Sequence, residues 1–361
     1  MLYKRVCIKI GSNVLADKKG GLNHKKIEHL AEQISLLKKQ GLEIILISSG
    51  AVAAGRQILP KPKINDTVAL RQIWASIGQV KLMNHYSEIF QKLDILCSQV
   101  LVTKSDFRDR EHYLNMKNCI LALLCTDILP IINENDVVSV TELMFTDNDE
   151  LAGLIASMID AEALIILSNV DGIYKNNKSG ANVEIIREIE NGINEIEEYI
   201  SANRSEFGRG GMITKSKIAR KVASQGIAVY ITNGLKENIL FDLLNDESKV
   251  LFTKFLPGKK RSTIKKWIAH TEGFEKGVVY INEGARKALY SNKATSLLFV
   301  GIIKIEGNFE KGDIVKIISE NGQTVGFGKV KFNSETAKSN IGKENIKPLI
   351  HYDYLYLKDD F

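Results

Sequence analysis

Small, polar, glycine-bearing segments recur where apolar segments of this sequence end, and their residue types suit chemistry on a phosphate group. Lys9 and Gly11 lie at the end of the first apolar segment, and residues 48–51 (SSGA) follow the second. Glycine lets backbone N–H groups approach phosphate oxygens, and lysine neutralises charge on a transferred phosphoryl group. Each segment alone could be an ordinary turn. Together they favour a phosphoryl-transfer site.

A second lysine, Lys215, follows the glycine-rich residues 208–211 (GRGG). Thr214 and Lys215 open an amphipathic pattern, so the glycines would present a helix N-terminus to a nucleotide. The sequence contains no Walker A motif and no HRD or DFG motif, which excludes P-loop and protein kinases.

Acidic residues complete the set. Residues 147–150 (DNDE) stand at a predicted helix start, where one carboxylate could cap the helix while another orients the two lysines. Asp136 could receive a substrate ammonium group. Lys9 lies on an otherwise apolar strand, so it either faces water on an edge strand or is buried with a partner, because burying it alone would be costly.

The elements that must position these residues alternate between strands and helices up to about residue 245. The expected strands are 5–10, 43–47, 95–102, 128–132, 163–167 and 227–231. A first helix is expected between its N-cap Asn23 and Gly41, and further helices are expected over 68–93, 111–124, 150–159, 215–224 and 237–244. Strands that are apolar throughout and separated by helices predict an α/β domain with a mainly parallel sheet sandwiched between helices.

Ligands bind such sheets beyond the carboxyl ends of the strands. Four loops would fall along that edge: 9–13, 48–51, 133–136 and 168–172. The polar stretch 174–206 interrupts the pattern, either as a hairpin and short helix beside the site or as a surface excursion.

The last part of the chain has a different character. Residues 257–261 (PGKKR) form a basic break, and from Gly277 onward short β-like segments are punctuated by glycines. Only 283–289 looks helical there. We expect a catalytic domain over 1–256, a basic linker over 257–269, and a small all-β, barrel-like domain over 270–361.

Composition sets few further limits. The 361 residues are 44% hydrophobic and 25% charged, with a net charge of +6, as in ordinary globular proteins. The four cysteines show no CxxC pair and fit reduced core thiols. The N-terminus has no signal-like segment and no apolar run is long enough for a bilayer, so a cytoplasmic location is expected.

Six segments, in this order, resemble the amino-acid kinase family, and within it the glutamate 5-kinases: VCIKIGSNVL, LISSGAVAAG, PIINENDVVSV, FTDNDELA, SNVDGIY and GRGGMITK. The tail, with INEGARKAL, GNFEKGDIVKI and GFGKVKFNS, resembles the PUA domain that many bacterial members carry. The resemblance covers nearly the whole chain.

The resemblance implies transfer of the γ-phosphoryl group of ATP to the side-chain carboxylate of L-glutamate, the first step toward proline. It implies that Lys9 and Lys215 stabilise the transferring group and that Asp149 holds both. Glutamate would contact Ser49, Asp136 and Asn148. ATP would contact Lys9, Ser168, Asn169, Arg209, Gly210, Gly211, Met212, Ile213, Thr214 and Lys215.

Mg²⁺ would be carried mainly by the phosphates and water, with no protein ligand named. The resemblance also implies homo-oligomers, dimers or tetramers, and feedback inhibition by proline. Two positions depart from the family pattern, since many members have Asp at 169 and a small hydroxyl residue at 209, where this chain has Asn169 and Arg209.

Two alternatives remain open. The chain could be another family member, such as an acetylglutamate, aspartate or uridylate kinase, although its NEND segment and its tail argue against this. It could also act mainly as an RNA binder, because PUA domains elsewhere bind RNA and residues 259–266 are basic. Acidic residues in the tail weaken that reading.

Overall fold

The computed structural model describes residues 2–17, 21–60, 63–139, 148–175, 184–190, 211–259, 262–269, 273, 275–291 and 294–358. The chain forms two compact units, Met1–Lys260 and Arg261–Phe361. None of the described helices is long and apolar enough to cross a membrane.

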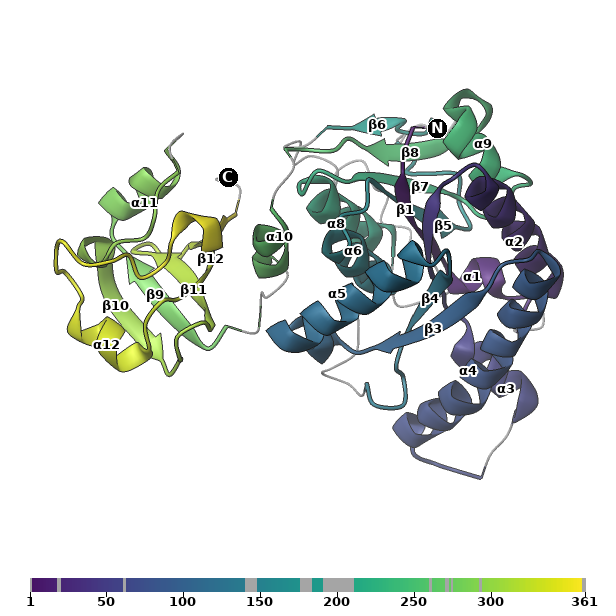
Figure 1. Ribbon diagram of the computed structural model, residues 1–361, viewed down its shortest axis with the longest axis horizontal. Helices are drawn as coiled ribbons and strands as arrows, with labels where there is room; N and C mark the ends of the chain where they lie inside the picture. Colours follow the sequence, from purple (N-terminus) through teal and green to yellow (C-terminus); the bar gives the residue numbers. More distant parts are fainter. Residues whose placement is uncertain are drawn as a thin grey trace. The chain divides into compact units, whose positions relative to one another are not determined.

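The first unit alternates strands and helices (Figure 1). Its strands are β1 (Arg5–Ile10), β2 (Glu43–Ile47), β3 (Cys97–Val102), β4 (Leu129–Glu134), β5 (Ala163–Ser168), β6 (Glu188–Ile189), β7 (Ala228–Asn233) and β8 (Phe252–Phe255). Its α-helices are α1 (Ser12–Leu15), α2 (His24–Lys39), α3 (Ala51–Ile58), α4 (Thr67–Lys92), α5 (Arg110–Cys125), α6 (Asn148–Met158), α8 (Met212–Ala223) and α9 (Ile239–Asn245), with short 3₁₀ turns η1 (Lys104–Phe107) and η3 (Glu247–Lys249).

The eight strands form one sheet in the order β3-β4-β2-β1-β5-β7-β8-β6. All neighbouring pairs are parallel except β7 and β8, which are antiparallel. The predicted mainly parallel sheet is therefore confirmed. Strand β1 lies inside the sheet, between β2 and β5, so Lys9 is not on an edge strand.

Alternation along β1 sends its side chains to two different layers of helices. Ile8 and Ile10 belong to the apolar core shared with α2, α4 and α9. The intervening residues, Cys7 and Lys9, therefore point to the opposite face. There α6 contacts β1 and β5, α8 contacts β7, and α5 contacts β4 (Figure 1). The strand period alone directs Lys9 toward α6 and α8.

Helices α3 and α4 cross with their backbones in contact. A Cβ atom added to Gly55 would overlap the carbonyl of Trp74, and one added to Gly78 would overlap the carbonyl of Ala51. Only glycine permits this approach. The crossing fixes the position of α4, which carries residues that reach the site described below.

Gly78→Ala is expected to destabilise the chain by about 1–3 kcal/mol, because the new methyl group must push α3 and α4 apart. Denaturant unfolding measures the change. The matched variant Ser76→Ala, on the exposed side of the same helix, should stay within about 0.5 kcal/mol of the unchanged chain. Equal stability of the two variants would contradict the proposed close crossing.

The second unit contains a five-stranded sheet in the order β10-β9-β11-β12-β13. Its elements are α10 (Thr263–Ala269), β9 (Gly277–Ile281), α11 (Glu283–Leu289), η4 (Phe299–Gly301), β10 (Ile302–Gly307), β11 (Ile314–Ser319), β12 (Thr324–Lys329), α12 (Ser334–Ser339), η5 (Tyr352–Tyr354) and β13 (Leu355–Leu357). The one helix predicted here is confirmed as α11. Two further short helices, α10 and α12, were not predicted, so the unit is not purely β.

Helix α10 lies inside the segment predicted as a basic linker. It packs against β12, β13 and η5 of its own unit, and its Lys266 and Trp267 are buried. One of the basic side chains considered for RNA binding is thus removed from the surface. The predicted domain limits, 1–256, 257–269 and 270–361, stay a prediction.

Candidate active site

Three charged side chains from distant parts of the sequence meet beyond the end of β1. Lys9 Nζ lies 2.6 Å from Asp149 Oδ1, and Lys215 Nζ lies 2.7 Å from Asp149 Oδ2. Strand β1 supplies Lys9, while the first turns of α6 and α8 supply Asp149 and Lys215. One carboxylate therefore holds two ammonium groups side by side.

The environment of this triad, Lys9, Asp149 and Lys215, keeps the carboxyl group of Asp149 ionised. Asp149 is fully buried, and the Lys9 and Lys215 side chains are only 3% and 12% exposed. Burial acts to raise the pKa of Asp149, but attraction to the two lysines prevails and lowers it to about 2. Two ammonium groups and one carboxylate give the triad one net positive charge, which can stabilise the negative charge of a phosphoryl group during its transfer.

Gly11 brings the backbone close to this charge. Its N–H donates to the carbonyl of Leu167, 3.1 Å away at the end of β5. A Cβ atom at this position would lie 2.9 Å from that carbonyl and 3.7 Å from Lys9 Nζ. A side chain here would crowd the strand ends and cover the ammonium group, so glycine keeps the approach to Lys9 open.

Asn148, the neighbour of Asp149, joins two strand ends to the start of α6. Its Nδ2 donates to the carbonyl of Ser48 at 2.8 Å, to Ser49 Oγ at 3.0 Å and to Asn133 Oδ1 at 3.2 Å. The loop after β2 and the end of β4 thereby meet the start of α6. The predicted substrate residues Ser49 and Asn148 are in contact beside the triad.

The fourth helix contributes residues that the sequence analysis missed. Asn133 Nδ2 donates to Gln79 Oε1 at 2.8 Å, and Arg71 Nη2 lies 2.7 Å from Asp136 Oδ1. Gln72 Nε2 also donates to the carbonyl of Val137 at 2.6 Å. Arg71 and Gln79 are eight residues apart, two steps of four along one face of α4. Polar side chains at that spacing on one face of α4 were the available signal.

The expected loop 133–136 begins inside the sheet rather than after it. Asn133 and Glu134 are the last residues of β4 and pair with Leu101 and Val102 of β3. This extension holds Asn133 in place, whereas Asp136 lies beyond the strand end. The predicted ammonium receptor, Asp136, therefore lies three residues after Asn133 and is paired with Arg71.

The predicted nucleotide residues lie at the other side of the triad. Ser168 ends β5, and its carbonyl accepts from Gly234 N–H at 2.8 Å, which joins the loops after β5 and β7. Gly211 precedes α8, whose first turn has no side-chain cap. The first residues of that helix, Met212, Ile213 and Thr214, direct their backbone N–H groups toward its N-terminus, where an anion can bind, while the Lys215 N–H donates to the carbonyl of Gly211 at 3.2 Å.

Some predicted positions lie outside the described residues. These are Arg209 and Gly210, together with Asp147 of the acidic segment and most of the polar stretch 174–206. Asn169 is described and lies next to Ser168, whose Oγ is 3.5 Å from its Oδ1.

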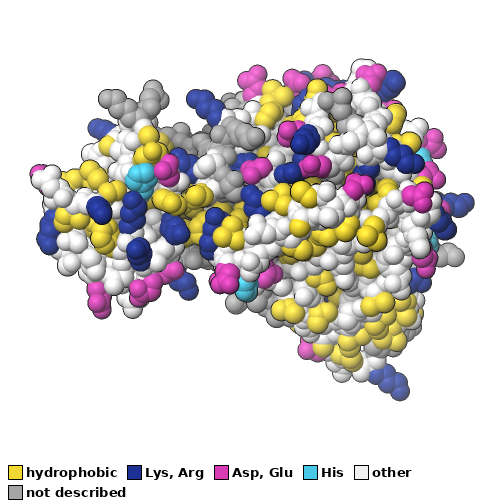
Figure 2. Space-filling view, in the orientation of Figure 1, with side chains coloured by type: hydrophobic (Ala, Val, Ile, Leu, Met, Phe, Trp, Pro, Cys, Tyr) yellow, Lys and Arg dark blue, Asp and Glu magenta, His cyan; other side chains and the backbone are white. Residues whose placement is uncertain are grey.

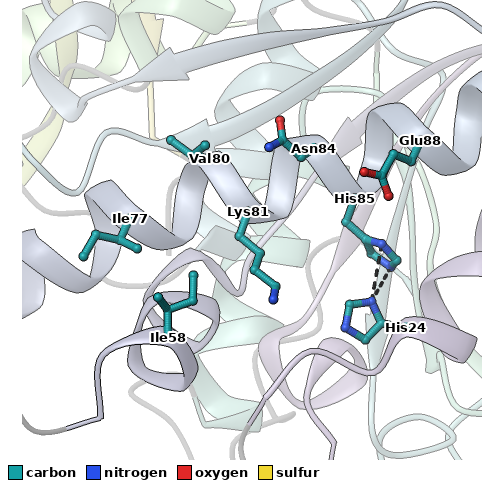
Figure 3. Close-up of a pocket in the computed structure, with 8 residues that line it drawn as sticks. All are labelled: His24, Ile58, Ile77, Val80, Lys81, Asn84, His85 and Glu88. Atoms are coloured by element: carbon teal, nitrogen blue, oxygen red, sulfur yellow. Dashed lines mark hydrogen bonds between the residues drawn. The ribbon is translucent and has the colours of Figure 1, made fainter.

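A hollow of about 630 Å³ elsewhere in the first unit contains none of the predicted site residues (Figure 3). Its lining comes from α3, α4 and the start of α2. Figure 3 shows the rings of His24 and His85 close together, and they are nearly perpendicular, with His24 Nδ1 2.9 Å from His85 Nε2. Burial and the neighbouring His24 lower the pKa of His85. The hollow is distinct from the triad.

The chain is similar to known proteins along nearly its whole length. A family model described as the amino acid kinase family matches residues 4–233, and one described as the PUA domain matches residues 277–350. The chain is 52% identical to a protein of Bacteroides thetaiotaomicron named glutamate 5-kinase, over 99% of both chains. It is 48% identical to one of the same name from Chlorobaculum tepidum, over 99% of this chain and 98% of the other.

Among solved structures, the carbamate kinase of Giardia lamblia bound to AMP-PNP matches with a TM-score of 0.52 and 20% sequence identity. The match covers 71% of this chain and 99% of that one. At this identity the likeness concerns the fold alone.

Proposed function

This chain belongs to the amino acid kinase family, and on that premise we propose that it transfers the γ-phosphoryl group of ATP to the side-chain carboxylate of L-glutamate. The product is L-glutamyl 5-phosphate, and the reaction is the first step toward proline. The observation that carries the proposal is the Lys9–Asp149–Lys215 triad at the ends of parallel strands.

The chemistry needs no general base. A side-chain carboxylate is ionised at neutral pH, so its oxygen can attack the γ-phosphorus directly. A new O–P bond forms, the bond from the γ-phosphorus to the β–γ bridging oxygen breaks, and ADP leaves with that oxygen. Lys9 and Lys215 stabilise the charge on the transferring group, while Asp149 fixes their positions.

The acceptor is bound on the α4 side of the triad. Ser49 and Asn148 contact glutamate there, and Asp136 receives its ammonium group. ATP lies on the opposite side, against Ser168, Asn169 and the first turn of α8, with Arg209 and Gly210 completing that segment. This division places the γ-phosphoryl group over the two lysines, between donor and acceptor.

Magnesium enters with the nucleotide. Within the described ranges, no three acidic, histidine or cysteine side chains are grouped to hold a metal ion. We propose that Mg²⁺ is carried by the phosphates and water, which is its usual mode with nucleotides. When bound, the ion neutralises charge on the phosphates.

Oligomeric state, inhibition by proline, RNA binding and a cytoplasmic location stay predictions. The expected homo-oligomer has some support from the surface. Figure 2 shows apolar side chains gathered over α4, β3 and α5. Among the residues on or next to these elements, Val80, Leu96, Leu101 and Leu114 are exposed. Exposed apolar patches of this kind mark interaction sites.

We expect ADP formation to depend on L-glutamate, with trapping of the acyl phosphate by hydroxylamine as a second readout. Parallel reactions contain N-acetylglutamate, L-aspartate or UMP, which are the acceptors of the alternative family members. Preference for any of these over L-glutamate would overturn the proposed substrate. ADP formation without hydroxamate would overturn the acyl phosphate product.

A further inference from the structure

The contact between α4 and the loop after β4 joins a cation to the predicted ammonium receptor. Arg71 Nη2 lies 2.7 Å from Asp136 Oδ1, and the two side chains are 29% and 11% exposed. Asp136 is thus mostly enclosed, while part of the guanidinium remains accessible.

Arg71 and Asp136 contact each other through one nitrogen and one oxygen only. Within the described parts of the chain, this single contact is the one hydrogen bond or ion pair made by the Arg71 guanidinium. A guanidinium carries five N–H donors in a planar fork that matches a carboxylate. The second carboxylate oxygen of Asp136 likewise has no other partner among those residues. A donor fork and an acceptor therefore stand next to each other.

This arrangement complements the main-chain end of an amino acid, where a carboxylate and an ammonium group share one carbon. The carboxylate fits the open donors of Arg71, and the ammonium fits the open oxygen of Asp136. A ligand with only one of these charges would leave the other protein charge without its complement.

The pair also lies at a suitable place relative to the triad. Asp136 is three residues from Asn133, so their Cα atoms are no more than about 11 Å apart. Asn133 contacts Asn148, which adjoins Asp149. Gln79, which contacts Asn133 through its Oε1, also has a buried Nε2 group with no hydrogen-bond partner among the described residues. A buried donor without an acceptor is costly, and a bound carboxylate would satisfy it.

We propose that Arg71 binds the α-carboxylate of the acceptor while Asp136 binds its α-ammonium group, so that the pair selects α-amino acids. The side chain of the acceptor then runs past Gln79 and Asn148 toward Lys9 and Lys215. This inference rests on the proposed function, since it assigns one end of the same acceptor. The alternative role for Arg71 is to position Asp136 without touching the acceptor, and the experiment below separates the two roles.

Two variants and two analogues separate these roles. Arg71→Ala is expected to raise KM for L-glutamate about 10–100-fold, the range for a lost hydrogen bond to a charged group, with kcat and KM for ATP within a few-fold. Arg71→Lys should recover part of the loss. Lys92→Ala, which removes an exposed lysine from the end of α4, should change neither constant.

Glutarate lacks only the ammonium group, and its Ki as a competitor gives the decisive comparison. Arg71→Ala should weaken the binding of glutarate about as much as the binding of L-glutamate, whereas Asp136→Asn should weaken the binding of L-glutamate alone. L-isoglutamine, with an amide in place of the α-carboxylate, is the second probe. The preference of the unchanged chain for L-glutamate over L-isoglutamine should shrink in Arg71→Ala.

The proposal is overturned if Arg71→Ala leaves KM unchanged, or if it behaves like Asp136→Asn and spares glutarate. Should glutarate not bind, an unaltered preference against L-isoglutamine in Arg71→Ala overturns it instead. These outcomes require turnover of L-glutamate by the unchanged chain. If that turnover is missing, the proposed function itself has failed, so the two failures are distinguishable.

Discussion

Replacing Lys9 or Lys215 by alanine is expected to lower kcat for L-glutamate-dependent ATP turnover about 10²–10³-fold in each case. Each lysine contributes a fixed positive charge in a site where Lys9 is 3% and Lys215 12% exposed. Such a charge acts strongly on the transition state because water screens it little. KM for L-glutamate should change far less than kcat, since neither lysine is placed at the main-chain end of the acceptor.

The control for this prediction is a lysine on α8, the helix that carries Lys215. Lys217 is exposed on α8, two residues beyond Lys215, so Lys217→Ala should keep kcat within about two-fold. Steady-state rates of ADP formation, with thermal unfolding of each variant as a check on folding, supply the data. If both lysine variants stayed within a few-fold of the unchanged rate, the mechanism would be wrong even with the right substrate.

Local patterns in the sequence were sufficient for the sheet. The strands around Lys9 and residues 43–47 were predicted with the limits they have, because short segments dominated by isoleucine, leucine and valine occur in strands buried on both faces. Asn23 is the N-cap of α2, and its side chain accepts from Lys26 N–H. These features depend on neighbouring residues, which sequence order displays directly.

The triad could be anticipated only in part. Alternation along β1 predicts the face on which Lys9 lies, but the distance from Lys9 to Asp149 depends on how α6 packs on that face. The motif resemblance supplied this grouping before the structure did. A lone lysine in an apolar strand leaves open whether it meets water or a carboxylate, and the packing of α6 decides this.

The contribution of α4 could not be read from the sequence. Arg71 and Gln79 reach Asp136 and Asn133 because α4 crosses α3 at Gly78, with no side chain between the backbones. Whether a helix turns a given polar face to a loop sixty residues away depends on such a crossing. The same holds for Lys266, whose burial follows from the packing of α10 rather than from its basic neighbours.

Asp149→Asn is expected to reduce both catalysis and stability. Removing the carboxylate leaves two ammonium groups facing a neutral amide in a buried site, and breaking a buried ion pair from one side costs about 3–5 kcal/mol. The amide keeps the shape of the side chain but cannot hold both lysines, so kcat should fall at least about 10²-fold. Denaturant unfolding and steady-state rates measure the two effects.

The stability contributed by Asp149 should also depend on pH. The pKa of Asp149 is lowered from 3.8 to about 2, so the stability it contributes is complete above pH 3.8 and is lost as pH falls through about 2. The stability difference between the unchanged chain and Asp149→Asn should therefore be flat from about pH 5 upward, as far as Asp149 is concerned. A kcat limb near pH 5 that disappears in Asp149→Asn would contradict a carboxylate held ionised by two lysines. The double variant Lys9→Ala, Asp149→Asn should lose less stability than the sum of the losses in the two single variants, because both substitutions break the same contact.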